Sequence, residues 1–116
     1  MTDYLLALYD DPSEFADLSP DEIQAVIGEY LAWSEKLRAA DRLIEGNKLA
    51  DGEGRVLRGG ETPTAVDGPY AEAREVLGGY TLVRAESYDD VTALCADHPH
   101  LKYGGTIEIR RIESFD

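Results

Sequence analysis

Hydrophobic residues recur along the chain with two different periods, and each period predicts an element. From Asp3 to Tyr9 apolar side chains occupy both alternating sides of the segment, which is typical of a central strand whose sheet is covered on both faces. From residue 20 to about residue 40 the spacing becomes 3.6, the period of a helix with one buried stripe. The members of that stripe are Ile23, Val26, Ile27, Tyr30, Trp33 and Leu37.

The start of this helix is marked by the segment Ser19-Pro20-Asp21-Glu22. A serine at the N-cap and a glutamate three residues later satisfy free backbone amides in a capping box, and proline is well tolerated at the first helical position. We therefore expect a helix from Pro20 to about Ala40.

Shorter elements follow, separated by turns rich in glycine. A second helix is expected after Ser87, with Val91, Leu94 and Cys95 buried and Pro99 as its end. An irregular stretch or one helical turn is expected at 71–76. Strands are expected at 46–50, 55–58, 63–66, 79–85 and 106–112. The order contains the βαββαβ pattern of the ferredoxin-like fold with an inserted β-hairpin, which predicts the α+β class.

The two helices of such a fold cover one face of its sheet. The first strand is nevertheless apolar on both sides, so we expect a second copy to cover the other face in an isologous dimer. Glu108 and Arg110, two residues apart on the last strand, point the same way. They could form an ion pair on the face turned to the partner.

Composition and net charge argue against several classes of function. The 116 residues fit a single domain spanning 1–116, and the net charge of −13 argues against nucleic acid and against an anionic membrane surface. No apolar run approaches the roughly 20 residues of a membrane span. The start Met1-Thr2-Asp3 lacks the basic segment of a signal peptide, so a cytoplasmic location is expected. Cys95 is the only cysteine, which excludes an intrachain disulfide and a cysteine metal cluster.

The segment 66–80, with sequence VDGPYAEAREVLGGY, combines turn residues, carboxylates and aromatics. Its Asp67-Gly68-Pro69-Tyr70-Ala71-Glu72 block, with Glu75 and the later Leu77-Gly78-Gly79-Tyr80, closely resembles the signature of the DGPF proteins in the YCII-related family. The beginning of the chain, its first helix and the ending Gly105-Thr106-Ile107-Glu108-Ile109-Arg110 resemble that family too. Tyr70 replaces the usual phenylalanine.

The resemblance implies a dimeric α+β barrel, in which two ferredoxin-like sheets pack face to face. It also implies a possible regulatory partner, because genes for DGPF proteins often lie beside those for extracytoplasmic-function sigma factors. The wider family is associated with a histidine on the first helix paired with an aspartate. Here the first helix has no histidine, and Tyr30 occupies the place.

Residues of the Asp67 segment are the main candidates for a site. Asp67, Glu72 and Glu75 place three carboxylates beside a Gly-Pro turn, and a carboxylate whose pKa is raised in an apolar pocket can transfer protons. The alternative is that Asp67 caps a turn while Glu72 and Glu75 are solvated. Aromatic residues that could line the pocket, or serve only in packing, are Tyr4, Tyr9, Tyr70 and Tyr80.

His98 is the candidate general base by residue type, because the unperturbed pKa of histidine is near 6.5. The pair His98 and His100 lacks the further ligands of a zinc site, so no metal or cofactor is expected. A histidine near a helix end favoured by the dipole is the simpler interpretation. Cys95 is interpreted as a small buried residue.

Three functions remain open. The first is a homodimeric binding protein for a small molecule, with Tyr9, Asp67, Tyr70, Glu72 and Tyr80 as ligand contacts. The second is a metal-free, cofactor-independent enzyme in which Asp67 or His98 abstracts a proton and a tyrosine steadies the oxyanion. The third is regulation of a sigma factor through the acidic surface.

Overall fold

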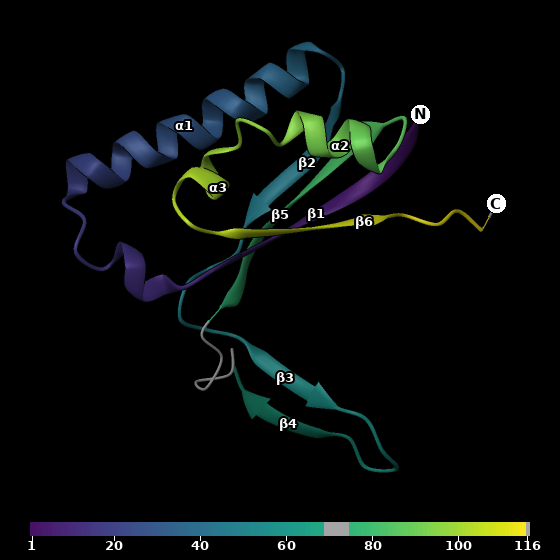
Figure 1. The fold of residues 1–116 in the computed structure, drawn as a ribbon. Coiled ribbons are helices and arrows are strands. Elements are labelled where there is room, and N and C mark those ends of the chain that lie inside the picture. Colours follow the sequence, from purple (N-terminus) through teal and green to yellow (C-terminus); the bar gives the residue numbers. More distant parts are fainter. Residues whose placement is uncertain (69–74, 116) are drawn as a thin grey trace.

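A computed structural model of the chain describes residues 1–68 and 75–115. Its main sheet has four antiparallel strands in the order β2-β5-β1-β6, and three helices cover one face (Figure 1). The elements are β1 (Thr2–Asp10), a 3-10 turn η1 (Pro12–Phe15), α1 (Pro20–Ala39), β2 (Leu43–Lys48), β3 (Arg55–Arg58), β4 (Thr64–Asp67), β5 (Val76–Ala85), α2 (Tyr88–Leu94), α3 (Pro99–Lys102) and β6 (Thr106–Arg111).

Without the β3–β4 hairpin, the strand order is that of the ferredoxin-like βαββαβ fold. The predicted fold class is confirmed. The hairpin forms its own two-stranded sheet and projects from the body (Figure 1). Its Leu57 and Val66 side chains are 70% and 48% exposed.

The helix-covered face of the sheet carries the core. Tyr4 lies opposite Val83, and Leu6 lies opposite Thr81. Their neighbours from the helices complete a cluster of buried residues: Tyr4, Leu6, Trp33, Leu37, Val83, Ala85, Val91 and Cys95. Complete burial of one such aliphatic side chain stabilises a fold by about 1.5–3 kcal/mol. The predicted burial of Val91 and Cys95 is confirmed.

Helix α1 begins as predicted. Ser19 Oγ accepts from the Glu22 amide, Glu22 Oε1 accepts from the Ser19 amide, and both donor–acceptor distances are 3.2 Å. The apolar stripe is buried only in the second half of the helix, where Trp33 and Leu37 enter the core. Its N-terminal half extends beyond the sheet (Figure 1), so Ile23 and Ile27 remain 39% and 44% exposed.

The prediction that Pro99 ends the second helix is wrong. Helix α2 already ends at Leu94, and Pro99 is the first residue of α3. Proline fits there because the first helical residue needs no hydrogen bond from its own nitrogen. His98 is therefore an N-cap, whose Nδ1 accepts from the His100 amide at 3.0 Å, and it does not lie at a helix C-terminus.

Two strands are longer at their start than their local pattern predicted. Strand β2 begins at Leu43 and β5 at Val76, where 46 and 79 were expected. The added residues of β2 pair with β5, whereas Val76 and Leu77 at the start of β5 pair with Asp10 and Tyr9 of β1, which is a tertiary effect. Of the predicted helical turn at 71–76, residues 71–74 lie outside the described part, and Val76 belongs to β5.

Candidate functional site

The predicted site residues do not all lie in one place. Asp67 ends β4 on the projecting hairpin, with a side chain that is 95% exposed and 4.0 Å from the Arg55 guanidinium. Glu75 accepts a hydrogen bond of 2.9 Å from the Thr106 hydroxyl. Tyr70 and Glu72 lie outside the described residues.

Tyr9 and Tyr80 lie on the sheet face that the helices leave uncovered. Side chains alternate between the faces of a strand, and the register aligns Asn47, Tyr80, Ala7 and Glu108 in one row across the four strands. Asn47 donates to the Tyr80 hydroxyl at 2.9 Å, and the Tyr9 hydroxyl donates to Glu108 at 3.3 Å. Polar groups from four strands therefore converge at this part of the face.

The neighbouring row on this face is mainly apolar at its centre. It runs from Glu45 through Leu82 and Leu5 to Arg110. Glu108 and Arg110 thus share the uncovered face. The two rows together form an apolar centre with charged side chains at both edges of the sheet.

A second group of polar side chains lies on the helix side of the sheet, around His100. The imidazole is 3% exposed. Its Nε2 lies 2.7 Å from the Tyr9 carbonyl oxygen, and its Nδ1 lies 2.7 Å from the Tyr30 hydroxyl. A carbonyl only accepts, so Nε2 carries the hydrogen and Nδ1 of the neutral ring accepts from Tyr30.

Two glycines make room for this group. A Cβ on Gly105 would lie 2.4 Å from His100 Nε2, so only glycine admits the ring in this position. A Cβ on Gly78 would lie 3.3 Å from the carboxylate of Asp10 at the end of β1. Burial raises the pKa of Asp10, and the electrostatic influence of His100 lowers it in part.

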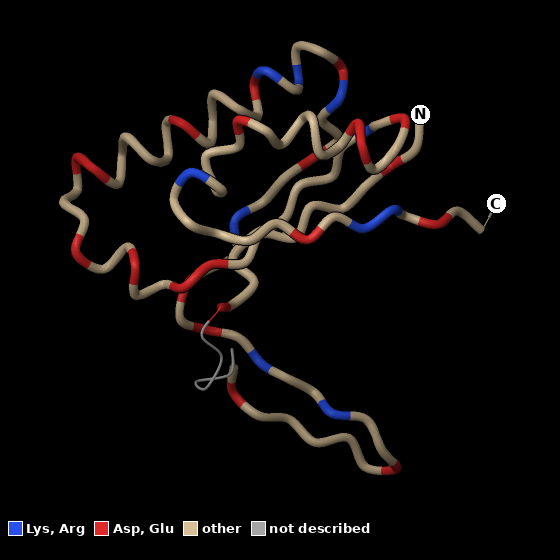
Figure 2. Tube along the Cα trace, viewed as in Figure 1, with Lys and Arg blue, Asp and Glu red and all other residues tan. Residues whose placement is uncertain are grey.

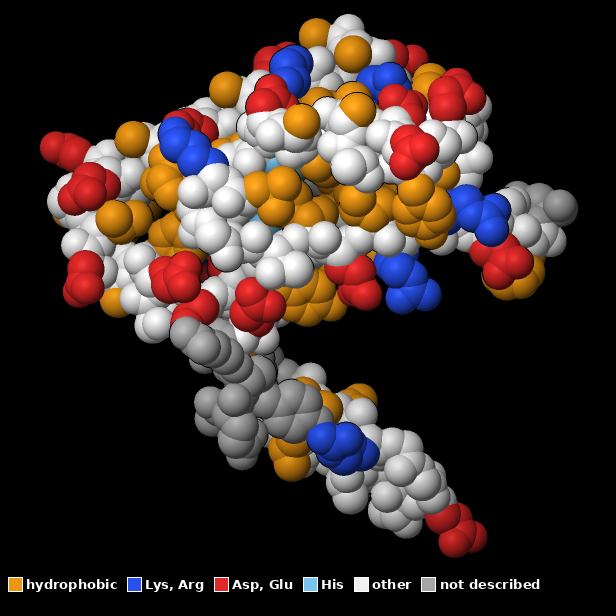
Figure 3. Space-filling view, viewed as in Figure 1, with side chains coloured by type: hydrophobic (Ala, Val, Ile, Leu, Met, Phe, Trp, Pro, Cys, Tyr) orange, Lys and Arg blue, Asp and Glu red, His pale blue; other side chains and the backbone are white. Residues whose placement is uncertain are grey.

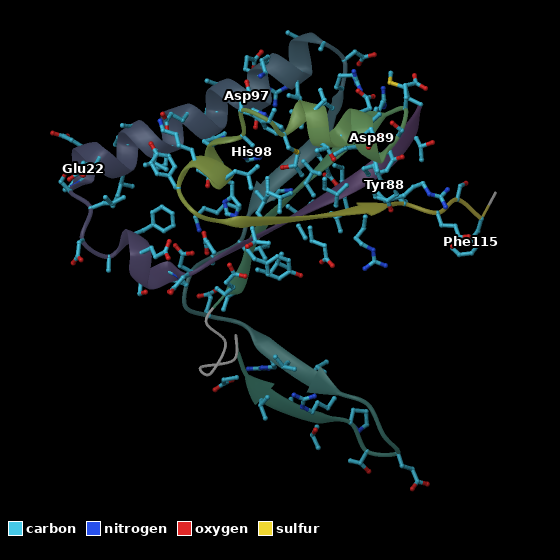
Figure 4. All side chains as sticks on the ribbon, in the orientation of Figure 1. Glu22, Tyr88, Asp89, Asp97, His98 and Phe115 are labelled. Carbon is cyan, nitrogen blue, oxygen red and sulfur yellow. The ribbon has the colours of Figure 1, made fainter. Side chains whose placement is uncertain are left out.

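His98, the predicted general base, is 2% exposed beside α3 (Figure 4). Its ring lies against Trp33, with 4.1 Å between the centroids. Burial, followed by the neighbouring His100, lowers the pKa of His98 to about 4, so the ring is neutral near pH 7. Its Nδ1 already accepts a hydrogen bond, so Nε2 carries the hydrogen, and this buried Nε2 has no partner among the described residues.

A family model of the YCII-related domain matches residues 2–116. The chain belongs to the YCII-related family.

One solved structure of similar fold is 5-chloro-2-hydroxyhydroquinone dehydrochlorinase from Burkholderia phenoliruptrix AC1100, in complex with 2,5-dihydroxybenzoquinone. The TM-score is 0.50, the sequence identity is 20%, and the match covers 96% of this chain and 93% of that one. At this identity the likeness shows the fold alone. No curated protein matches the chain.

The acidic residues of this YCII-related chain are of a type that binds metal ions. Acidic side chains are spread along α1 and around the end of β1 (Figure 2). Even so, within residues 1–68 and 75–115 no three His, Cys, Asp or Glu side chains are placed to hold a metal ion. No helix in the described part is long and apolar enough to cross a membrane.

Sequence analysis did not assign a role to Asp10 or to the contact between Tyr30 and His100. Tyr30 and His100 are 70 positions apart, and no local pattern joins them. One available signal was the consecutive pair Gly104-Gly105 shortly after α3, since glycine allows a close approach of neighbouring atoms.

Proposed function

We propose that this YCII-related protein is a homodimeric small-molecule binding protein whose ligand lies on the uncovered sheet face, beneath a second copy. The proposal rests on the two rows of side chains that cross the four strands on that face. Leu5 and Leu82 form an apolar centre, and the hydroxyls of Tyr9 and Tyr80 lie in the polar part beside it. A binding site typically combines an apolar lining with a few placed polar groups.

The hydrogen bonds on this face indicate what the ligand offers. The Tyr80 hydroxyl accepts from Asn47, which leaves its own proton to donate. The Tyr9 hydroxyl donates to Glu108 and retains lone pairs to accept. A small, mainly apolar compound with one acceptor and one donor matches this arrangement.

The Asp67 segment belongs to the same proposal through chain connectivity. Residues 67–75 lead directly into β5, whose Leu77 lies opposite Tyr9. Tyr70 and Glu72 therefore remain proposed ligand contacts, with Asp67 at the turn that introduces them.

The dimer is tested by the change Leu82→Lys, which places a charge in the apolar centre. We expect the wild-type protein to sediment at twice the chain mass of 12.8 kDa and the variant as a monomer with an unchanged circular dichroism spectrum. Leu57→Lys, on the exposed hairpin, is the matched control and should leave the mass unchanged. A monomeric wild-type protein would overturn the proposal.

Ligand binding is tested by a thermal-shift screen of small neutral aromatic compounds. A compound that stabilises the wild-type protein should lose most of its effect in Tyr80→Phe, because that change removes the donor. Tyr88→Phe removes a hydroxyl from α2 and should leave the effect intact. Equal stabilisation of Tyr80→Phe and the wild type would contradict a site on this face.

A further inference from the structure

The uncovered face of the sheet carries opposite charges on its two edge strands. The row through Leu82 and Leu5 ends in Glu45 on β2 and in Arg110 on β6. Both residues are exposed, and within residues 1–68 and 75–115 neither belongs to an ion pair. In the space-filling view, an acidic and a basic side chain project downward from the body beside apolar side chains (Figure 3).

The two tyrosine hydroxyls of the proposed site lie near opposite edges of this sheet. The Tyr80 hydroxyl accepts from Asn47 on β2, at one edge, and the Tyr9 hydroxyl donates to Glu108 on β6, at the other. Three strand spacings separate these edges, about 14 Å. A compound with one aromatic ring is shorter than this distance, so it does not reach both hydroxyls within one copy.

A second copy on this face brings the two hydroxyls together if the two-fold axis of the dimer runs along the strands. Strand β2 of each copy then lies over β6 of the partner, and β5 lies over the partner's β1. The Tyr80 hydroxyl of one copy lies at the same edge as the partner's Tyr9 hydroxyl. Glu45 lies opposite the partner's Arg110, and these long side chains span the roughly 10 Å between packed sheets.

The flanking rows match in the same orientation. Asn47 lies opposite the partner's Glu108. The Asn47 amide donates one hydrogen to Tyr80 and retains a second, and the Glu108 carboxylate has a second oxygen that accepts. On the other side of the Leu82 row, Arg84 lies opposite the partner's Asp3. All three rows therefore place a donor over an acceptor.

An axis across the strands gives a poorer match. It places β2 over the partner's β2, whose side chains on this face are those of Glu45 and Asn47. Glu45 then meets no cation, and a carboxylate that is covered without one loses solvation that nothing restores. The hydroxyls of Tyr9 and Tyr80 also remain at separate edges. Charge complementarity thus favours the axis along the strands.

We propose that each ligand site of the dimer is shared between two copies, with the Tyr80 hydroxyl from one copy and the Tyr9 hydroxyl from the other. The two-fold axis runs along β1 and β5, and Glu45 pairs with the partner's Arg110 at both edges. This arrangement rests on the dimer and the ligand face proposed above, and it adds which copy supplies each hydroxyl.

The variant Glu45→Arg tests the pairing, because it places like charges opposite each other. We expect sedimentation equilibrium to show association weakened by roughly tenfold or more. The change also reduces the net charge of −13, so general repulsion between copies would predict tighter association instead. Glu61→Arg, between β3 and β4, changes the net charge equally and is the matched control. The double variant Glu45→Arg/Arg110→Glu should regain association.

Oxidative cross-linking of the wild-type protein supplies a readout of the tyrosines themselves. Light, a ruthenium complex and persulfate join tyrosine rings that lie close together. Mass spectrometry of the covalent dimer should find Tyr9 joined to Tyr80, and this link should be lost in Tyr80→Phe and kept in Tyr88→Phe. If the wild type is dimeric but lacks the link, or if Glu45→Arg associates as tightly, the shared site is wrong while the dimer stands. A monomeric wild type would overturn both.

Discussion

The two faces of the four-stranded sheet differ far more in burial than in residue type. Leu6 and Leu5 are neighbours in β1, yet Leu6 is 0% exposed while Leu5 is only half-buried. Val83 and Leu82 differ in the same way in β5. The helices of one chain suffice for one face alone. A strand that is apolar on both sides therefore indicates more apolar surface than a single chain covers.

The largest expected effect is a difference in stability between substitutions on the two faces. Leu6→Ala should lower the free energy of unfolding by about 2–5 kcal/mol, because it leaves a cavity in the core. Leu5→Ala should cost less than about 1 kcal/mol in the monomer, since a surface substitution leaves no enclosed cavity. Urea unfolding measures both, and sedimentation should show that Leu5→Ala weakens association. Equal losses of stability would contradict the distinction.

Acid should lower the stability of the fold because His98 is buried on the helix-covered side of the sheet. Its pKa is about 4 in the folded protein against 6.5 for a free histidine, so the unfolded chain binds more protons between those values. Stability from the neutral ring is complete above pH 6.5 and declines as the pH falls toward 4, by roughly 3 kcal/mol at most.

The matched variant is His98→Asn, which keeps a good N-cap side chain but does not titrate in this range. Unfolding free energies measured at a series of pH values should decline less steeply for the variant than for the wild type. Parallel curves would show that the buried ring is not responsible.

The start of the first helix and the presence of the first strand were predictable because their signals are local. The Ser19 capping box joins residues three apart, and the alternation that predicts β1 lies within the single segment Asp3 to Tyr9. The start of α3 was missed because histidine is not among the favoured N-caps, so Pro99 resembled a stop signal.

The site was predictable only in part. Tyr9 and Tyr80 were proposed as ligand contacts because they are aromatic, and the alternation along their strands explains why both lie on the uncovered face. The Tyr30–His100 contact depends on how α1 crosses the sheet and where α3 begins, and neither is encoded near those residues. Asp10 gains its raised pKa from burial at the end of β1, which is likewise a tertiary property.

The smallest expected effects come from alanine substitutions at two glycines. Gly105→Ala should displace the His100 ring and cost about 1–3 kcal/mol, because a Cβ there overlaps the imidazole. Gly28→Ala, on α1 with nothing within 4 Å, should stabilise the protein by about 0.4–1 kcal/mol. Thermal unfolding followed by circular dichroism measures both. A stable Gly105→Ala protein with unchanged His100 resonances would contradict the close packing.

Tyr9 makes a hydrogen bond on each face of the sheet, one with its side chain and one with its backbone. Its hydroxyl points to Glu108 on the uncovered face, whereas its backbone carbonyl accepts from His100 on the covered face. Every amino acid supplies that carbonyl, so natural variation at position 9 can redesign the uncovered face without altering the tautomer of His100. The two faces are therefore free to evolve separately at this residue.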